Sequence, residues 1–482
     1  MSIPAEQAEA AALLRHLAGS AAPVETHISA LFLGAERVLK LKKAVDLGFL
    51  DFTTLDARQR FIEREMALNA PHAPGLYRAV HPVTRGRDGA LRLGGAGEAV
   101  EWALEMARVP PGDFLDEVAR RGGIDAGLQD ALGDAVAALH HDLPPVGGWD
   151  APAAMARVIE GNRRAALAAG LPGARIAAWA AAAVAALDRL APWLARRATG
   201  GAVRRCHGDL HLGNLLLWQG APAPFDALEF DEALATIDTG YDLAFLLADL
   251  DRQVGRGAAN RVLNRYVARS GDAALVEGLP LWLSLRALIR AHCLARTGAD
   301  GLPCLDQAEV ALRPAAPRLL AIGGLPGSGK SFWGRRWAPA IGAAPGALIL
   351  RSDEIRKRRH GLAPEQRLPP EAYAPAENAA VHEELFAAAA TALAAGHSVI
   401  ADAAFLDPML RQGIEAVGRQ AGIPLQGIWL EAPLELLRDR VAARRGDASD
   451  AGLAVLAAAA ARDPGAIAWR RLDTSGAMPT SI

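Results

Sequence analysis

The sequence predicts two domains of different fold class: an α+β domain with two lobes over residues 1–312, and an α/β domain with a parallel sheet over residues 318–482. Three observations support this prediction. The first part of the chain reads as strands around a single helix, followed by a long alanine-rich helical region. The second part alternates apolar strands with helices, which is typical of a parallel sheet. A chain of 482 residues is also long enough for separate cores.

Composition and charge exclude several classes of protein. The chain is 51% hydrophobic and 22% charged with a net charge of -2, so we do not expect nucleic acid as its partner. Three cysteines fit neither a disulfide framework nor a zinc site. The N-terminus lacks a signal-peptide pattern, and the most apolar stretch, residues 176–187, is too short to span a bilayer. We therefore expect a cytoplasmic protein with no membrane partner.

The elements of the first lobe follow from the spacing of apolar residues. Residues 5–18 have the period of an amphipathic helix, and residues 27–43 read as two strands joined by a Gly-Ala-Glu turn. A helix is expected at 56–69 and a further strand at 98–109. This order of strands, helix and strand predicts a small lobe built on a sheet.

The second lobe is expected to be mainly helical. Residues 126–200 predict alanine-rich helices, residues 204–230 a loop and a hairpin, and helices continue to about Arg296. Residues 297–317 contain Gly and Pro without a strong period, so we expect the linker there. Strands of the second domain are predicted after the linker, at 319–322, 347–350, 398–401 and 425–430.

A glycine-rich motif follows the first strand of the second domain. It reads GLPGSGKS and matches G-x-x-x-x-G-K-[ST] between a strand and a helical segment, which is the context that the motif requires. The glycines allow a tight turn, so that backbone N–H groups point at phosphate oxygens. Lys330 would contact the β- and γ-phosphates of ATP and Ser331 would bind Mg²⁺. The residues expected to bind the nucleotide are Gly324, Gly327, Ser328, Gly329, Lys330 and Ser331.

Two carboxylates stand at the ends of later strands of this domain. Asp353 is the candidate base for an acceptor hydroxyl, and Arg351 and Arg356 beside it would bind an anionic group. A helix start with Asp353 as its N-cap is the alternative. Asp402 ends a buried strand, the position of a Walker B carboxylate that orders Mg²⁺.

An arginine cluster follows in the segment LLRDRVAARRGDASDA. Arg440 and Arg444 lie one helical turn apart, with Arg445 beside them. Arginines on a mobile lid can close over phosphates and neutralise charge in the transition state, so Arg440 and Arg444 are candidate catalytic residues. A salt-bridged surface helix is the alternative. Residues 318–460 resemble the P-loop kinase group that includes gluconate kinase, polynucleotide kinase, chloramphenicol phosphotransferase and zeta toxins.

The first domain has a motif of its own, HGDLHLGN, with the spacing of a kinase catalytic loop. Asp209 is the candidate base, and Asn214 is a candidate Mg²⁺ ligand. The hairpin after the loop brings Asp226 back toward the same metal, with Glu229 and Asp231 as alternatives.

A kinase of this type also needs a lysine on the phosphates of ATP and a helix glutamate that holds it. Lys40 and Lys42 share one face of a strand, and Lys40 is the first choice. Glu65 lies on the apolar face of its helix and is the expected partner of Lys40. A solvated lysine and glutamate are the alternative reading.

The loop HGDLHLGN and the later segment DTGYDLAFLLADL resemble the aminoglycoside phosphotransferase family, which includes choline, homoserine and maltose kinases. Asp238 and Asp242 in that segment are expected to buttress the loop. Taken whole, the chain resembles a family of bifunctional aminoglycoside phosphotransferase/ATP-binding proteins. One departure is the absence of a G-x-G-x-x-G motif between the first strands.

The resemblance implies a two-lobed kinase-like domain fused to a P-loop NTPase domain, with ATP and Mg²⁺ as cofactors. The function expected is an ATP-dependent phosphotransferase with two nucleotide sites, acting on a small-molecule hydroxyl acceptor such as a sugar or amino sugar. Two alternatives stay open: an ATP-binding regulatory sensor with little turnover, and an aminoglycoside-resistance kinase.

Overall fold

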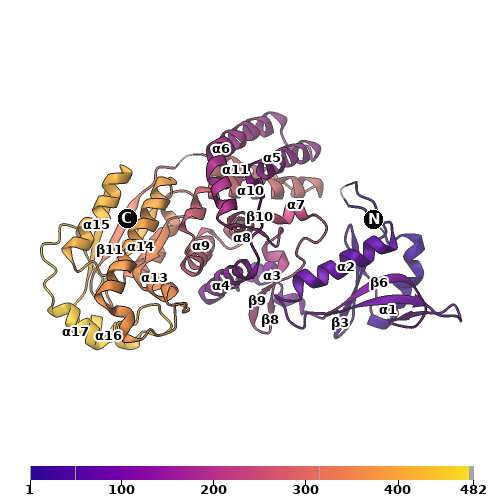
Figure 1. Cartoon of the computed structure of the whole chain (residues 1–482), viewed down its shortest axis with the longest axis horizontal. Helices are drawn as coiled ribbons and strands as arrows, with labels where there is room; N and C mark the ends of the chain where they lie inside the picture. Colours follow the sequence, from indigo (N-terminus) through magenta and orange to yellow (C-terminus); the bar gives the residue numbers. More distant parts are fainter. Residues whose placement is uncertain (1, 49, 314, 477–482) are drawn as a thin grey trace. The chain divides into compact units, whose positions relative to one another are not determined.

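The computed structural model describes residues 2–48, 50–313 and 315–476 (Figure 1). The chain divides into two compact units. The first unit comprises residues 1–124, 143–146 and 204–237, and the second comprises residues 125–142, 147–203 and 238–482. The domain boundary between residues 312 and 318 stays a prediction.

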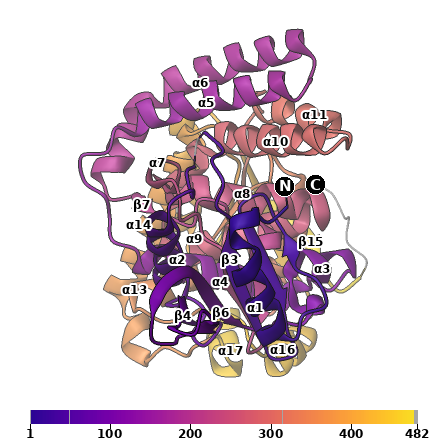
Figure 2. The ribbon, with the colours of Figure 1, turned by 90° about the vertical axis from the view of Figure 1, so that its right-hand side faces the viewer.

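An antiparallel sheet of six strands, in the order β1-β2-β3-β6-β4-β5, forms the centre of the first unit. Its strands are β1 (Val24–Glu25), β2 (Ser29–Leu33), β3 (Arg37–Lys42), β4 (Tyr77–Arg85), β5 (Leu91–Leu93) and β6 (Glu98–Ala107). Helix α1 (Ala8–Ala18), preceded by the short η1 (Ala5–Gln7), contacts β2 and β3 (Figure 2). Helix α2 (Leu55–Asn69) contacts β4 and β6. Because side chains alternate along a strand, Ala103 of β6 packs in the core under α1 and Leu104 in the core under α2.

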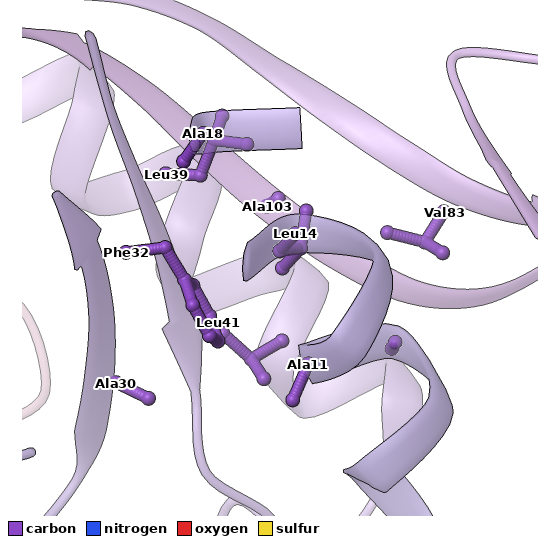
Figure 3. Packing of buried hydrophobic residues seen from close by; sticks show 10 residues of the cluster. Ala11, Leu14, Ala18, Ala30, Phe32, Leu39, Leu41, Val83 and Ala103 are labelled. Carbon is purple, nitrogen blue, oxygen red and sulfur yellow. The ribbon is translucent and has the colours of Figure 1, made fainter. Parts of the chain in front are cut away.

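Strand β3 uses the same alternation to separate apolar from charged side chains. Leu39 and Leu41 are fully buried with Leu14 of α1 (Figure 3). Lys40 and Lys42 therefore face away from that core, toward α2. The apolar face fixes the register of the strand, and the register in turn fixes where the two ammonium groups lie.

The remaining elements of the first unit are short. A two-residue turn at Gln219 and Gly220, both with positive φ, joins the antiparallel strands β8 and β9. The elements are η2 (Pro111–Asp113), α3 (Leu115–Arg120), β7 (Val203–Arg205), η3 (Leu212–Asn214), β8 (Leu215–Trp218), β9 (Ala221–Pro224), α7 (Glu232–Ala235) and β10 (Thr236–Asp238), which ends one residue inside the second unit. The predicted loop and hairpin at 204–230 are present.

The second unit begins with helices. Helix α5 lies beside α6, and α10 lies beside α11 (Figures 1 and 2). The helical elements are α4 (Ala126–Asp142), α5 (Ala151–Ala168), α6 (Gly173–Thr199), α8 (Thr239–Gln253), α9 (Arg256–Ser270), η4 (Ala273–Glu277), α10 (Leu279–Arg296) and α11 (Leu302–Ala311).

Helix α11 corrects the expectation of an irregular linker at 297–317. Leu305 and Ala308 are fully buried, and the backbone oxygen of Ala308 accepts a hydrogen bond from Ser284 Oγ at 2.6 Å. The helix is stabilised by packing on α10, whereas its own sequence has only a weak apolar period. Tertiary contacts thus form a helix where local pattern predicted a linker.

A parallel sheet of five strands, in the order β12-β13-β11-β14-β15, completes the second unit. The strands are β11 (Leu319–Gly323), β12 (Leu348–Arg351), β13 (Val399–Asp402), β14 (Leu425–Glu431) and β15 (Arg470–Asp473). The connections contain α12 (Lys330–Trp337), η5 (Ala338–Ala340), α13 (Ser352–Arg359), η6 (Pro370–Tyr373), α14 (Pro375–Ala394), α15 (Pro408–Ala421), α16 (Leu434–Ala443) and α17 (Leu453–Ala461). The predicted fold class, α+β followed by a parallel α/β sheet, is confirmed. None of the helices in the described part of the chain combines the length and apolar character that a membrane span needs.

Candidate active sites

The first candidate site lies in the first unit, where β3, α2 and the loop after β9 meet. Lys40 Nζ donates to Glu65 Oε1 at 2.7 Å and to Asp226 Oδ1 at 2.8 Å. Burial would lower the pKa of Lys40, but the carboxylates of Asp226 and Glu65 outweigh it and raise that pKa well above its ordinary value. The structure thus brings together three residues that the sequence assigned to nucleotide and metal binding.

Lys42 holds the other oxygen of the same glutamate. Its Nζ donates to Glu65 Oε2 at 2.8 Å and to Glu229 Oε1 at 2.5 Å, and its side chain is 1% exposed. The sequence left the choice between Lys40 and Lys42 open. Of the two, Lys40 is the one that pairs with Asp226, the candidate metal ligand, while Lys42 is enclosed by Glu65 and Glu229.

The backbone around Asp226 is held in an uncommon conformation. Asp226 has φ of 57°, in the left-handed region that non-glycine residues seldom adopt. Its N–H donates to the Tyr77 hydroxyl at 3.0 Å, the N–H of Ala227 donates to Asn69 Oδ1 at 2.9 Å, and His207 Nε2 donates to the oxygen of Phe225 at 2.9 Å. Lys40 holds the pKa of Asp226 below its usual value, although the side chain is 46% exposed. The carboxylate is therefore ionised, fixed in place and open on one side.

The catalytic-loop motif places its two polar residues against each other. Asn214 Nδ2 donates to the backbone oxygen and to Oδ2 of Asp209, both at 3.0 Å. This bonding uses the amide nitrogen and leaves the Asn214 amide oxygen as the atom suited to Mg²⁺. His211, which the sequence did not single out, accepts from the N–H of Gly213 through Nδ1, and its Nε2 lies 3.5 Å from Asp209 Oδ2.

Three other acidic residues near the motif have structural partners. Asp231, an alternative to Asp226, caps the N-terminus of α7. Asp238 caps α8 and accepts from Arg197 at 2.6 and 2.8 Å. Asp242 Oδ2 lies 3.1 Å from His140 Nε2, deep in the core of the second unit. These contacts are helix caps and ion pairs, and the expectation that Asp238 and Asp242 buttress the loop stays a prediction. The side chain of Asp226, by contrast, is 46% exposed.

The second candidate site is the glycine-rich loop after β11. Gly324 has φ of 138°, and a Cβ there would lie 2.4 Å from the backbone oxygen of Leu430, so the position requires glycine. Lys330 Nζ donates to the backbone oxygens of Gly324 and Leu325 at 2.9 and 3.1 Å. The Oγ of Ser328 is buried, and no described residue forms a hydrogen bond with it. A tight loop that contains a lysine ammonium group and a buried hydroxyl without a partner among the described residues fits a phosphate group.

Asp402 lies beside this loop because β13 pairs in parallel with β11, with Asp402 opposite Ile322. Ser331 Oγ donates to Asp402 Oδ2 at 2.6 Å, and Asp402 is 4% exposed. A hydroxyl and a carboxylate in contact at the loop are oxygen ligands of the kind that Mg²⁺ prefers, so these residues fit the metal. Burial lowers the pKa of Lys330, and Asp402 and Asp353 oppose that shift.

Arg351 was expected to bind an anionic group, but its neighbours in the structure are carboxylates of the protein. It contacts Glu354 at 2.7 Å, Asp447 at 3.1 Å and Asp402 at 3.3 Å, and it is 3% exposed. Its charge is neutralised by protein carboxylates, so its contacts do not favour the binding of an anionic ligand. Asp353 occupies the second position of α13 and is not the N-cap, which is Arg351. Burial raises the pKa of Asp353, although Arg351 opposes the shift.

Arg356, three residues after Asp353 on α13, has weaker neutralisation: it helps to lower the pKa of Glu377, without a salt bridge to it. It is 5% exposed, its Nη1 donates to the oxygen of Ala372 at 2.7 Å, and its guanidinium lies 4.9 Å from the centre of the Tyr373 ring. In the described part of the chain no carboxylate forms an ion pair with it, and its Nε has no hydrogen-bond partner. A buried guanidinium in this state is suited to an anion.

The three arginines of the cluster have different contacts with the glycine-rich loop. Arg440 donates to Oγ1 and the backbone oxygen of Thr474 at 2.9 and 2.8 Å and lies 3.4 Å from the oxygen of Gly327. Arg444 is the C-cap residue of α16, and its charge helps to lower the pKa of Lys330. Arg445 donates to backbone oxygens of its own segment and is exposed. Arg444 is therefore the cluster member whose charge acts on the loop lysine, while Arg440 joins the loop to the end of β15.

Two comparisons cover most of the chain. The uncharacterized proteins Mb2027c of Mycobacterium bovis and Rv2004c of Mycobacterium tuberculosis are each 28% identical over 486 residues, which cover 95% of this chain and 93% of the relative. Among solved structures, choline kinase from Cryptosporidium parvum has 9% identity and a TM-score of 0.39 over 60% of this chain and 87% of its own.

The other comparisons concern the C-terminal part. A gluconokinase structure from Sinorhizobium meliloti has 21% identity and a TM-score of 0.23 over 34% of this chain and 85% of its own. Residues 319–463 match the family model described as an AAA domain. That match, the parallel sheet and the geometry of the loop make this part of the chain a P-loop nucleotide-binding domain.

Proposed function

We propose that this protein is an ATP-dependent phosphotransferase with two nucleotide sites, each of which transfers the γ-phosphoryl group to a hydroxyl of a small molecule. The observation that carries the proposal is the contact of Lys40 with both Glu65 and Asp226, which joins a strand lysine, a helix glutamate and a candidate metal ligand in one network. The P-loop with its Ser331–Asp402 pair supports a second, separate site.

In the first site, each residue has a defined task. Lys40 would neutralise the phosphates, and Glu65 would keep the lysine in place. Asp226 and the amide oxygen of Asn214 would hold Mg²⁺. Asp209 would take the proton of the acceptor hydroxyl. The hydroxyl oxygen would form a bond to the γ-phosphorus, and the bond between that phosphorus and the oxygen that leaves with ADP would break. Mg²⁺·ATP supplies the transferred group.

In the second site, the loop residues and Lys330 would bind the phosphates, and Ser331 and Asp402 would hold Mg²⁺. Asp353 would be the base. Its raised pKa brings the carboxyl closer to the working pH, where a base accepts a proton most effectively. Arg444 would stabilise the charge that develops on the transferred group.

The acceptor of the second site is proposed to carry a negative charge. Arg356 supports this because it is a buried guanidinium that forms no salt bridge with any described carboxylate. It lies on the same helix as Asp353, one turn further along. A phosphate or carboxylate on the acceptor would fill this position, so the second site could use a product of the first.

The experiment that tests the proposed function is mass spectrometry of small-molecule extracts incubated with the full chain and ATP. The expected result is one or more hydroxyl compounds that gain a phosphoryl group. Asp209→Asn and Asp353→Asn, both close in size to the parent residue, should each remove different products. If ATP is bound but no compound gains mass with the parent protein, the function proposed here is wrong.

A further inference from the structure

The second unit contains a polar cavity that neither candidate site uses. It has a volume of about 140 Å³ and lies between helices α4 and α9 on one side and β12, α12 and α13 on the other. The charged residues that line it are Asp130, Arg261, Arg265, Arg335, Arg351 and Glu354. A space of this size holds several water molecules and is large enough for a phosphate group.

The walls of the cavity are held together by hydrogen bonds. β12 is the edge strand of the parallel sheet, and side chains of α9 bind its free edge. The N–H of Ile349 donates to Asn264 Oδ1 at 2.6 Å, and Asn260 Nδ2 donates to the oxygen of Ala347 at 3.0 Å. Because the amides of α9 replace a neighbouring strand, the cavity is a fixed part of this unit.

Most arginines of the cavity have carboxylate partners at short distance. Arg261 binds both oxygens of Asp130, at 2.7 and 2.5 Å. Arg265 binds both oxygens of Asp134, at 2.7 and 2.6 Å, and also pairs with Glu365 outside the cavity. Arg351 has three carboxylates around it, as described above. These guanidinium groups are neutralised by the protein.

Arg335 differs from the others. Within the described residues its one ion-pair partner is Glu354 at 3.8 Å, and Glu354 is already bound to Arg351 at 2.7 Å. Burial lowers the pKa of Arg335, and the charges of Arg351 and Arg261 add to the shift, while Glu354 and Asp130 oppose it. The group lies on α12, four residues after Ser331, and its side chain is 36% exposed.

We propose that this cavity is a binding site for an oxyanion, namely a phosphate ion or the phosphate group of a small metabolite, with Arg335 as its principal ligand. The planar guanidinium matches a phosphate with two parallel hydrogen bonds. The bound anion supplies the negative charge that Arg335 lacks. Through Glu354 and Arg351 the site is joined to Asp402, the carboxylate that contacts Ser331. The site would therefore sense phosphate beside the P-loop without being part of it.

The test uses the full chain with the substitutions Lys330→Ala and Arg356→Gln, which remove the loop lysine and the other guanidinium proposed to bind an anion. Saturating Mg²⁺·ADP fills the first site, so that phosphate binding at either candidate active site does not contribute. Sodium phosphate is titrated against sodium chloride of equal ionic strength, and Tm is measured. Arg335→Gln is compared with Arg336→Gln, since Arg336 is the next residue on α12, is exposed, and lines no part of the cavity.

The expected result is a saturable rise in Tm with phosphate in the parent and in Arg336→Gln. In Arg335→Gln the rise should disappear, or need phosphate concentrations higher by about tenfold or more. An equal response in the two variants, or no saturable response in the parent beyond that to chloride, would overturn the proposal.

A second measurement covers the case in which the variant folds poorly. Because Arg335 lacks a close counter-charge, Arg335→Gln should have a Tm in the absence of phosphate that is no lower than that of Arg336→Gln. A markedly lower Tm for Arg335→Gln would mean that Arg335 is already well paired within the protein, and the oxyanion site would be rejected.

Discussion

Lys40 and Asp226 are 186 residues apart in the sequence, yet Lys40 Nζ and Asp226 Oδ1 lie 2.8 Å apart. The contact joins strand β3 to the loop after the β8–β9 hairpin within one compact unit. It is maintained although Asp226 adopts a left-handed backbone conformation, which costs about 1 kcal/mol or more for a residue with a Cβ. The contact with Asp226 distinguishes Lys40 from Lys42, and we expect the two lysines to have different functions.

Replacement of the two lysines by methionine should separate catalysis from stability. Lys40→Met should lower kcat/KM of the first site by about 100-fold or more, because the phosphates lose their cation, while Lys42 still pairs with Glu65. Lys42→Met should lower Tm more strongly, because Glu229 is left buried without its lysine. Steady-state kinetics in an Asp353→Asn background and thermal denaturation measure the two effects. Equal effects of both variants on kcat/KM would contradict the assignment of Lys40.

As the pH is lowered, the second site should lose activity earlier, that is, at a higher pH, than it would with an aspartate of ordinary pKa. The pKa of Asp353 is raised, so its carboxyl stays protonated, and inactive as a base, to higher pH than the ordinary value of about 3.9. The rate should therefore rise with pH through the raised pKa. The pH profile of kcat/KM in an Asp209→Asn background checks this. A rate that stays constant down to about pH 4 would argue against Asp353 as the base.

Gly324→Ala should prevent nucleotide binding at the P-loop and lower stability. The new Cβ would lie 2.4 Å from the oxygen of Leu430, in addition to the strain of a φ of 138°. The matched control is Gly396→Ala, which also has a positive φ of 75° but has no atom within 4 Å of its Cβ. We expect the control to lose about 1 kcal/mol and Gly324→Ala to lose more. Differential scanning calorimetry of both variants, with and without Mg²⁺·ADP, tests this prediction. Similar losses of stability in the two variants would mean that the contact with the Leu430 oxygen is relieved at no cost.

The two candidate lid arginines should behave differently. Arg440→Ala removes the hydrogen bonds to Thr474 and should lower Tm. Arg444→Ala removes one longer hydrogen bond, to the oxygen of Ser449 at 3.3 Å, so it should lower Tm less than Arg440→Ala. It should lower kcat of the second site by about tenfold or more, because its charge acts at the loop. Parallel measurements of Tm and kcat for the two variants distinguish bracing from catalysis. A fall in kcat for Arg440→Ala alone would reverse the two assignments.

Sequence patterns predicted the parts of the sites that depend on local spacing. The alternation along β3 placed Lys40 and Lys42 on one face, and the glycine motif placed Lys330 and Ser331 at a helix N-terminus. The same alternation could not decide between the two lysines, since both share the face and both contact Glu65. Lys40 is proposed as the nucleotide lysine because it contacts Asp226, which a distant segment of the chain provides.

Other features depend on contacts that no local pattern contains. Arg351 resembled an anion-binding residue, but two of its carboxylate partners lie 51 and 96 residues away in the sequence. The segment of helix α11 was predicted to be a linker because its apolar period is weak. The helix is stabilised by its contacts with α10, which the local sequence does not reveal. Strand β15 was not predicted, because its sequence RRLD has no apolar run and most of its side chains are exposed.

The central claim is that two separate sites transfer a phosphoryl group, and ATP labelled with ¹⁸O in the γ-phosphoryl group tests it most directly. The full chain, Asp226→Asn, Lys330→Ala and the double variant are each incubated with a small-molecule extract, and labelled products are identified by mass. The account predicts labelled products from the parent, a distinct subset from each single variant and none from the double variant. Labelled products from the double variant at the level of the parent would contradict it.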